Sequence, residues 1–305
     1  MKFTLLSGLI AAPYTPFAGD GRLNVARIPE LAAALHRNGV RGAFVCGTTG
    51  EGTALTHDER RNVTEAWTRA RPAGLAVIVH VGHNCLAESA ALAEHARAVG
   101  ADAFAMLPPS QPRPATLDDL IACCALVAAA APELPFYYYH MPVATGVNFA
   151  MADFIRAAAP RIPNLAGVKF TYEHLMDFGQ ALAVDPARFV VLHGRDETLL
   201  AGLALGAKGA VGSTYNYAAP VYHRVMRAFA AGDIATARRE QALAVRIVEV
   251  MVRHGGLAAG KAIMKLIGLD CGGMRLPQRS ITPEAEAQLK ADLTAIGYFE
   301  AISQV

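Results

Sequence analysis

The sequence predicts an α/β protein built as a closed (β/α)8 TIM barrel with an appended C-terminal helical bundle. Short apolar runs recur along the first 211 residues, and longer amphipathic segments lie between most of them. Continuously apolar strands are typical of burial on both faces, and strand–helix alternation is typical of parallel crossover units. The first such run continues into APYTPF and lacks the glycine fingerprint of a doubly wound nucleotide-binding sheet. Eight units of this kind favour a closed barrel.

The expected strands are short, mostly apolar and bounded by polar or turn-forming residues. They are Leu9–Ala12, Ala43–Cys46, Ala76–Val81, Ala103–Met106, Phe136–Tyr139, Ala166–Lys169, Val190–His193 and Ala210–Val211. The segments between them carry apolar residues at helical spacing. We expect helices at Ala26–Arg37, Asp58–Arg69, Ala87–Val99, Leu117–Ala130, Ala152–Ala158 and Thr198–Leu205.

The C-terminal part of the chain has a different pattern, helical and without further strands from about Ala218 onward. We therefore expect a barrel domain over residues 1–231 that carries the site and a helical extension over residues 232–305. The helices expected here are Val221–Ala231, Ile234–His254, Ala262–Ile267 and Pro283–Ile296.

Composition excludes several classes of function. The net charge is +2 over 305 residues, and no run of Lys or Arg stands out, so neither nucleic acid nor an anionic membrane is an expected partner. The longest uncharged run, Leu134–Ala152, contains two prolines and is not expected to cross a membrane. The five cysteines form no C-x-x-C pair and are typical of reduced, buried thiols. The N-terminal segment fits a buried strand better than a signal peptide, so we expect a cytoplasmic protein.

The carboxyl ends of barrel strands are where active sites lie, and Lys169 ends the sixth expected strand. Burial disfavours the charged form of an amine, and a neutral amine can attack a ketone to form an imine. Thr171 lies two residues later, on the same side if the strand continues. The alternative is a lysine that reaches from the strand end into solvent.

Three consecutive tyrosines occupy the fifth expected strand. Because side chains alternate between the two faces, Tyr137 and Tyr139 share one face and Tyr138 lies on the other. A phenol at the strand end can transfer a proton to and from reacting oxygens. Aromatic packing is the alternative for each member of the run.

Further polar groups follow three other strands. Thr48 and Thr49, flanked by glycines, offer hydroxyl and backbone N–H donors for a carboxylate, or they form an ordinary turn before a helix. Asp196 and Glu197, with the hydroxyls of the GSTYN segment at residues 212–216, are suited to a polyhydroxylated ligand, or they are solvated loop charges.

A metal centre is not expected. His80 and His83 lie three residues apart, and His140 and His193 end other strands, but neither an H-E-x-x-H motif nor Cys/His ligand spacing occurs.

Taken together, these segments resemble the dihydrodipicolinate synthase/N-acetylneuraminate lyase family. The similarity runs from APYTPF near the start to MRLPQ at Met274–Gln278 and covers most of the chain. Several stretches are most similar to the animal-type lyase branch of that family. They are FYYYHMP with the following ATG, GVKFT, LMDFGQ at Leu175–Gln180, GSTYNY at Gly212–Tyr217 and KAIM at Lys261–Met264.

The resemblance implies a role for each matching position. Lys169 matches the Schiff-base lysine, Tyr139 the catalytic tyrosine, and Thr48 and Thr49 the pair that binds the pyruvate carboxylate. The positions that match the polyol site are Thr171, Gly194, Asp196, Glu197 and Ser213. The implied reaction is the reversible retro-aldol cleavage of N-acetylneuraminate, a 2-keto acid, to N-acetylmannosamine and pyruvate. The resemblance also implies a homotetramer that needs neither a metal nor an organic cofactor.

Two departures from the family pattern bear on specificity. Ser110 and Gln111 stand where family members often carry aromatic residues, so a role for such an aromatic is in doubt. Val143 and Ala144 follow the tyrosine's proline, where dihydrodipicolinate synthases usually place an arginine, which argues against that substrate. Aldol cleavage or dehydration of another 2-keto-3-deoxy sugar acid stays open, as does, more remotely, a non-catalytic member that only binds ligand.

Overall fold

The computed structural model describes residues 3–303, and its centre is a closed barrel of eight parallel strands in chain order. β1 pairs with β2 on one side and with β8 on the other, where Gly8 lies opposite Gly209 and Ala11 opposite Gly212. This confirms the predicted fold, and two strands have the predicted bounds. The strands are β1 Gly8–Ala11, β2 Gly42–Val45, β3 Ala76–His80, β4 Ala103–Met106, β5 Phe136–His140, β6 Leu165–Phe170, β7 Val190–His193 and β8 Gly209–Gly212.

Helices follow the strands and cover the outside of the barrel. They are α1 Ile28–Arg37, α2 His57–Ala70, α3 Leu86–Ala98, α4 Leu117–Ala128, α5 Pro142–Thr145, α6 Met151–Ala158, α7 Leu175–Leu182 and α8 Leu199–Ala204. Short 3-10 turns, η1 Val25–Arg27, η2 Gly52–Ala54 and η3 Asp196–Thr198, precede α1, α2 and α8.

The side chains of β5 show how the barrel separates its two cores. Tyr137 and Tyr139 belong to the apolar cluster inside the barrel, whereas Tyr138 faces the helices and packs its ring 4.6 Å from that of Phe154. The predicted alternation along this strand is therefore confirmed. It places the phenol of Tyr139 at the carboxyl end of the barrel interior.

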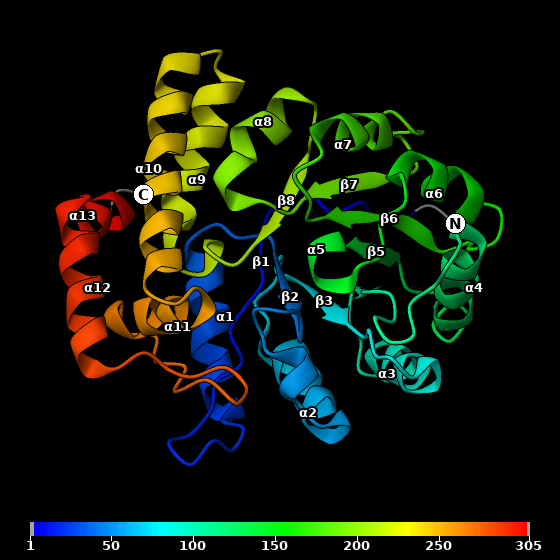
Figure 1. The fold of residues 1–305 in the computed structure, drawn as a ribbon, viewed down its shortest axis with the longest axis horizontal. Helices are drawn as coiled ribbons and strands as arrows, with labels where there is room; N and C mark the ends of the chain where they lie inside the picture. Colours follow the sequence, from blue (N-terminus) through cyan, green and yellow to red (C-terminus); the bar gives the residue numbers. More distant parts are fainter. Residues whose placement is uncertain (1–2, 304–305) are drawn as a thin grey trace.

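The C-terminal helices gather on one side of the barrel (Figure 1). α10 packs along α9 and also contacts α8 and η3. Their bounds are α9 Tyr215–Ala230, α10 Ile234–Arg253, α11 Leu257–Leu266, α12 Pro283–Ala295 and α13 Tyr298–Ser303.

Helix starts are where the sequence was least informative. In α9, helical turns begin at Tyr215, before the expected Val221, and a kink with a non-helical backbone at Ala218 (φ −131°) separates them from the helix that continues through Pro220. α11 begins at Leu257, directly after Gly255 and Gly256, earlier than the expected Ala262. Within residues 3–303, no helix has both the length and the apolar character that a membrane span requires.

Candidate active site

A cavity of about 280 Å³ opens where the strands end. Every residue that the sequence singled out for catalysis or substrate binding lines it. These residues are Thr48, Thr49, Tyr139, Lys169, Thr171, Gly194, Asp196, Glu197 and Ser213. They come from five strand ends, so the barrel brings together positions up to 165 residues apart, from 48 to 213.

Lys169 lies at the base of this cavity, near the end of β6. It is 4% exposed, and its Nζ lies 3.9 Å from the ring centre of Tyr139 and 4.1 Å from that of Phe44. Among the described residues, no carboxylate forms an ion pair with it. A buried amine that faces aromatic rings and has no neutralising partner is suited to nucleophilic attack on a carbonyl.

Tyr139 lies opposite Lys169 in the register of β5 and β6. Its hydroxyl donates a hydrogen bond to the sulfur of Met141 at 3.2 Å, and the Thr48 hydroxyl lies 4.0 Å from the same sulfur. Sulfur is a weak acceptor, so this contact orients the phenol without holding its proton strongly. Met141 lines the cavity and was not predicted as a site residue.

The segment after β2 is a tight turn that presents Thr48 and Thr49. Thr48 is exposed and Thr49 is buried, and the Thr48 carbonyl accepts a hydrogen bond from the Glu51 N–H at 3.1 Å. The Thr15 hydroxyl donates to the Gly50 carbonyl at 2.6 Å and ties the turn to the segment after β1.

Asp196 is buried at the opposite side of the cavity. Its Oδ2 accepts hydrogen bonds from the Thr214 N–H at 2.9 Å and from the Thr214 hydroxyl at 2.6 Å. Burial raises the pKa of Asp196 to about 6, the Thr214 hydrogen bonds oppose this rise, and the charge of Glu197 adds to it. A Cβ on Gly212 would lie 1.8 Å from Asp196 Oδ1, so only glycine leaves room for this carboxylate.

Glu197 is held from two directions. Its carboxylate forms an ion pair with Arg195, whose Nε lies 3.4 Å from Oε1 and which also pairs with Glu173. From α10, the Gln241 side chain donates to the Glu197 carbonyl at 3.1 Å. Arg195 also lines the cavity and was not predicted as a site residue.

Thr171 and Gly194 meet between the ends of β6 and β7. The Thr171 hydroxyl is buried and makes no hydrogen bond to any described residue. A Cβ on Gly194 would lie 2.1 Å from that hydroxyl oxygen. Glycine therefore allows this close approach, and the threonine hydroxyl is left without a hydrogen-bond partner among the described residues.

The outer wall of the cavity was not foreseen. It is apolar and comes from the C-terminal helices, with Val248, Met251 and Val252 on α10 and Leu257 on α11. The first three have i, i+3, i+4 spacing on one helix face, which is the signal that could have identified them. The sequence predicted these helices only as an appended bundle, without residues that line the site.

The histidines noted in the sequence do not form a metal centre. His80 ends β3, where its Nδ1 lies 3.1 Å from the Cys46 carbonyl and its Nε2 accepts the Leu107 N–H at 3.2 Å. Burial is the main cause that lowers the pKa of His80 well below its usual value. Within residues 3–303, no cluster of three or more His, Cys, Asp or Glu side chains could hold a metal ion.

Comparison with known proteins agrees with this geometry. The sequence model of the dihydrodipicolinate synthetase family matches residues 5–296. The N-acetylneuraminate lyase of Pongo abelii is 43% identical over 297 residues, which cover 94% of this chain and 92% of that protein.

Two solved structures of N-acetylneuraminate lyases each superpose with a TM-score of 0.94. That of Proteus mirabilis is 41% identical, with 97% of this chain and 100% of that chain covered. That of Aliivibrio salmonicida is 38% identical, with 97% and 98% covered. The chain therefore belongs to the dihydrodipicolinate synthetase family.

Proposed function

We propose that this chain cleaves N-acetylneuraminate reversibly to N-acetylmannosamine and pyruvate, through an imine on Lys169. The observation that carries the proposal is the placement of Lys169. It is a buried lysine, without an ion pair among the described residues, that faces the ring of Tyr139 in a cavity with hydroxyl and carboxylate groups on its far side. The similarity to N-acetylneuraminate lyases over nearly the whole chain supports the choice of substrate.

In the first step, the amine of Lys169 attacks the C2 carbonyl of the open-chain keto acid. The carbinolamine that forms loses its hydroxyl as water, for which the Tyr139 phenol supplies the proton. The products are a protonated imine and a phenolate.

In the second step, the Tyr139 phenolate takes the proton of the C4 hydroxyl. The C3–C4 bond breaks, its electron pair moves into the imine to give the pyruvate enamine, and the aldehyde N-acetylmannosamine leaves. Protonation of the enamine at C3 and hydrolysis of the resulting imine release pyruvate and restore Lys169. The imine is the electron sink, so the proposal needs neither a metal nor an organic cofactor.

The two sides of the cavity bind different parts of the substrate and so orient it. Thr48 and Thr49 bind the carboxylate next to C2, because hydroxyl and backbone N–H donors satisfy an anion well. The distant hydroxyls meet the other side, formed by Thr171, Gly194, Asp196, Glu197 and Ser213.

The proposal also includes the cellular location, the assembly and the domains of the protein. We place the enzyme in the cytoplasm as a homotetramer, with residues 1–231 as its catalytic barrel and residues 232–305 as a helical extension.

The first test is pyruvate release from N-acetylneuraminate, with Lys169→Ala alongside the wild type. Release by the wild type alone supports both the substrate and the imine lysine. If neither releases pyruvate, the assignment of N-acetylneuraminate is wrong, and other 2-keto-3-deoxy sugar acids are then assayed with the same pair of proteins.

A further inference from the structure

Two stretches that resemble the family have no part in the chemistry proposed above. One is KAIM, which begins with Lys261 on α11, and the other is MRLPQ, which contains Arg275. Both lie beyond the barrel in sequence, and neither Lys261 nor Arg275 lines the cavity. Both contact the segment that follows Thr48 and Thr49.

Glu51 connects the C-terminal extension to this segment. Its Oε1 lies 2.8 Å from the Lys261 ammonium, and its Oε2 accepts the Arg275 backbone N–H at 2.8 Å. The Lys261 ammonium also donates to the Gly273 carbonyl at 2.6 Å. Glu51 and Lys261 are each 3% exposed, so this is a buried ion pair between the β2–α2 segment and α11.

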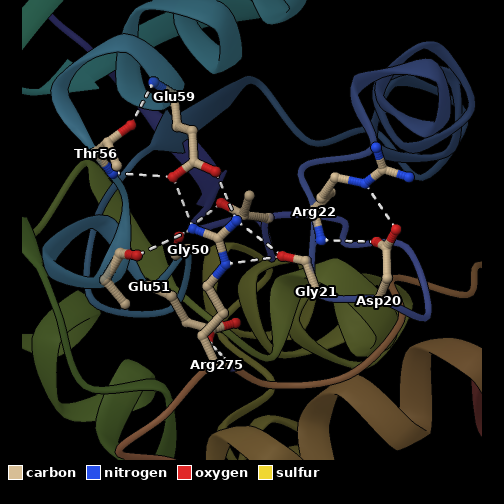
Figure 2. A network of polar contacts seen from close by, with 10 residues as sticks. Asp20, Gly21, Arg22, Gly50, Glu51, Thr56, Glu59 and Arg275 are labelled. Atoms are coloured by element: carbon tan, nitrogen blue, oxygen red, sulfur yellow. Dashed lines mark hydrogen bonds and ion pairs between the residues drawn. The ribbon is translucent and has the colours of Figure 1, made fainter.

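The side chain of Arg275 binds the other end of the same segment. Its two terminal nitrogens form paired hydrogen bonds to the Glu59 carboxylate at 2.6 and 2.7 Å. Glu59 in turn accepts the Thr56 N–H at 2.9 Å, which completes the capping box that starts α2. Figure 2 shows the Arg275 guanidinium between Glu59 and Gly21, whose carbonyl accepts from it at 2.9 Å.

An aromatic ring holds both cations in place. The Lys261 Nζ lies 4.2 Å and the Arg275 Cζ 4.3 Å from the ring centre of Phe17. Cation–π contacts at these distances favour one arrangement of the two cations relative to the barrel.

The backbone at Glu51 needs such support. Its φ of 53° lies in the left-handed region, which a non-glycine residue adopts only where the surroundings hold it. In this conformation its N–H reaches the Thr48 carbonyl at 3.1 Å. The contacts of the Glu51 carboxylate therefore bear directly on the turn that presents Thr48 and Thr49.

We propose that Glu51, Lys261 and Arg275 are positioning residues that hold Thr48 and Thr49 in the geometry that binds the keto-acid carboxylate. Lys261 and Arg275 of the C-terminal extension thus set the affinity of the pyruvate end of the site, although neither residue lines the cavity. The inference rests on the proposed function, because it assumes that the threonine pair binds that carboxylate.

The test measures borohydride trapping of pyruvate by the full-length enzyme as the pyruvate concentration is varied. Lys261→Met removes the ammonium with little change in length. The pyruvate concentration for half-maximal trapping should rise about tenfold, the loss expected when hydrogen bonds to a charged group are misaligned. The maximal trapping rate should stay within about threefold, because Lys169 and Tyr139 are untouched.

A double variant separates positioning from folding. Lys261→Met alone leaves the Glu51 charge buried without its partner, which lowers the thermal midpoint. Glu51→Gln with Lys261→Met removes both charges, so the midpoint should recover while the half-saturating pyruvate concentration stays high. Arg275→Gln, which leaves the buried pair intact, should raise that concentration by a smaller factor.

Lys265→Met is the matched control, since it makes the same change one turn along α11 in an exposed pair with Glu286. It should trap pyruvate like the wild type. The positioning role is wrong if the double variant recovers wild-type pyruvate affinity together with its thermal midpoint, or if Lys261→Met never alters that affinity. A wild-type protein that traps no pyruvate would instead contradict the proposed function itself.

Discussion

The phenol of Tyr139 can be tested apart from the amine of Lys169. Tyr139→Phe keeps the ring that lies 3.9 Å from Nζ and removes only the hydroxyl. We expect turnover of N-acetylneuraminate to fall by about 10²–10⁴, the range for loss of a general acid–base group. After long incubation with pyruvate and borohydride, the variant should still gain the pyruvate-derived mass, whereas Lys169→Ala should gain none. Turnover close to that of the wild type would exclude Tyr139 as the proton carrier.

The raised pKa of Asp196 predicts that substrate binding depends on pH. Because its pKa is raised to about 6, the carboxylate is ionised above that pH and neutral below it. The ionised form is the better acceptor for substrate hydroxyls, so kcat/KM for N-acetylneuraminate should fall as the pH falls through about 6. The measurement is the ratio of kcat/KM between wild type and Asp196→Asn across this range. A ratio that does not change with pH would show that Asp196 is not the titrating group.

Site residues were easiest to predict from the sequence where they end an expected strand. Lys169 and Tyr139 end two of the expected strands and match family positions with a catalytic role, and the structure places both in the cavity. Met141 and Arg195 lie past strand ends, and they were missed because the family resemblance assigned a role to neither position. Each contacts a predicted residue only two positions away, Tyr139 or Glu197, through a side-chain conformation that the fold determines.

At the scale of elements, α10 supports, through Gln241, the side of the cavity that we propose binds the substrate hydroxyls. This side chain is buried, donates to the Asp196 and Glu197 carbonyls and accepts the Leu200 N–H. Gln241→Leu should lower the free energy of unfolding by about 1–3 kcal/mol, because buried polar groups lose their partner. It should also raise the KM for N-acetylneuraminate while leaving pyruvate trapping unchanged.

The control is Gln288→Leu on α12, where the side chain is exposed and donates to Asp292. Surface changes of this kind are expected to alter stability by less than about 0.5 kcal/mol. Urea unfolding and steady-state kinetics of both variants give the comparison. Equal effects at the two positions would contradict a specific role for α10.

The strands were predictable as elements because burial on both faces requires nearly continuous apolar sequence. The residues at which helices begin were less predictable. Pro220 is typical of a helix start, yet the chain forms helical turns from Tyr215 before it, with Ala218 taking up the irregularity. α7, Leu175–Leu182, was not foreseen as a helix, although its LMDFGQ segment was noted for family resemblance.

At the scale of the whole molecule, the expected homotetramer can be measured directly. The chain has a mass of 32.2 kDa and exposes several large apolar side chains, with Val143 83% and Leu276 74% accessible. Light scattering after size-exclusion chromatography should give four times the chain mass at micromolar concentration. A monomer mass would contradict the assembly.

The closure of the barrel through β1 and β8 also affects how the chain folds during its synthesis. Residues 8–11 leave the ribosome about 200 residues before their second partner strand, residues 209–212. At a synthesis rate of about 5–20 residues per second, this edge of β1 stays unpaired for about 10–40 s. An open strand edge invites pairing with other chains. We therefore expect nascent chains to depend on chaperones until β8 emerges, and folding yield to fall when synthesis pauses before residue 209.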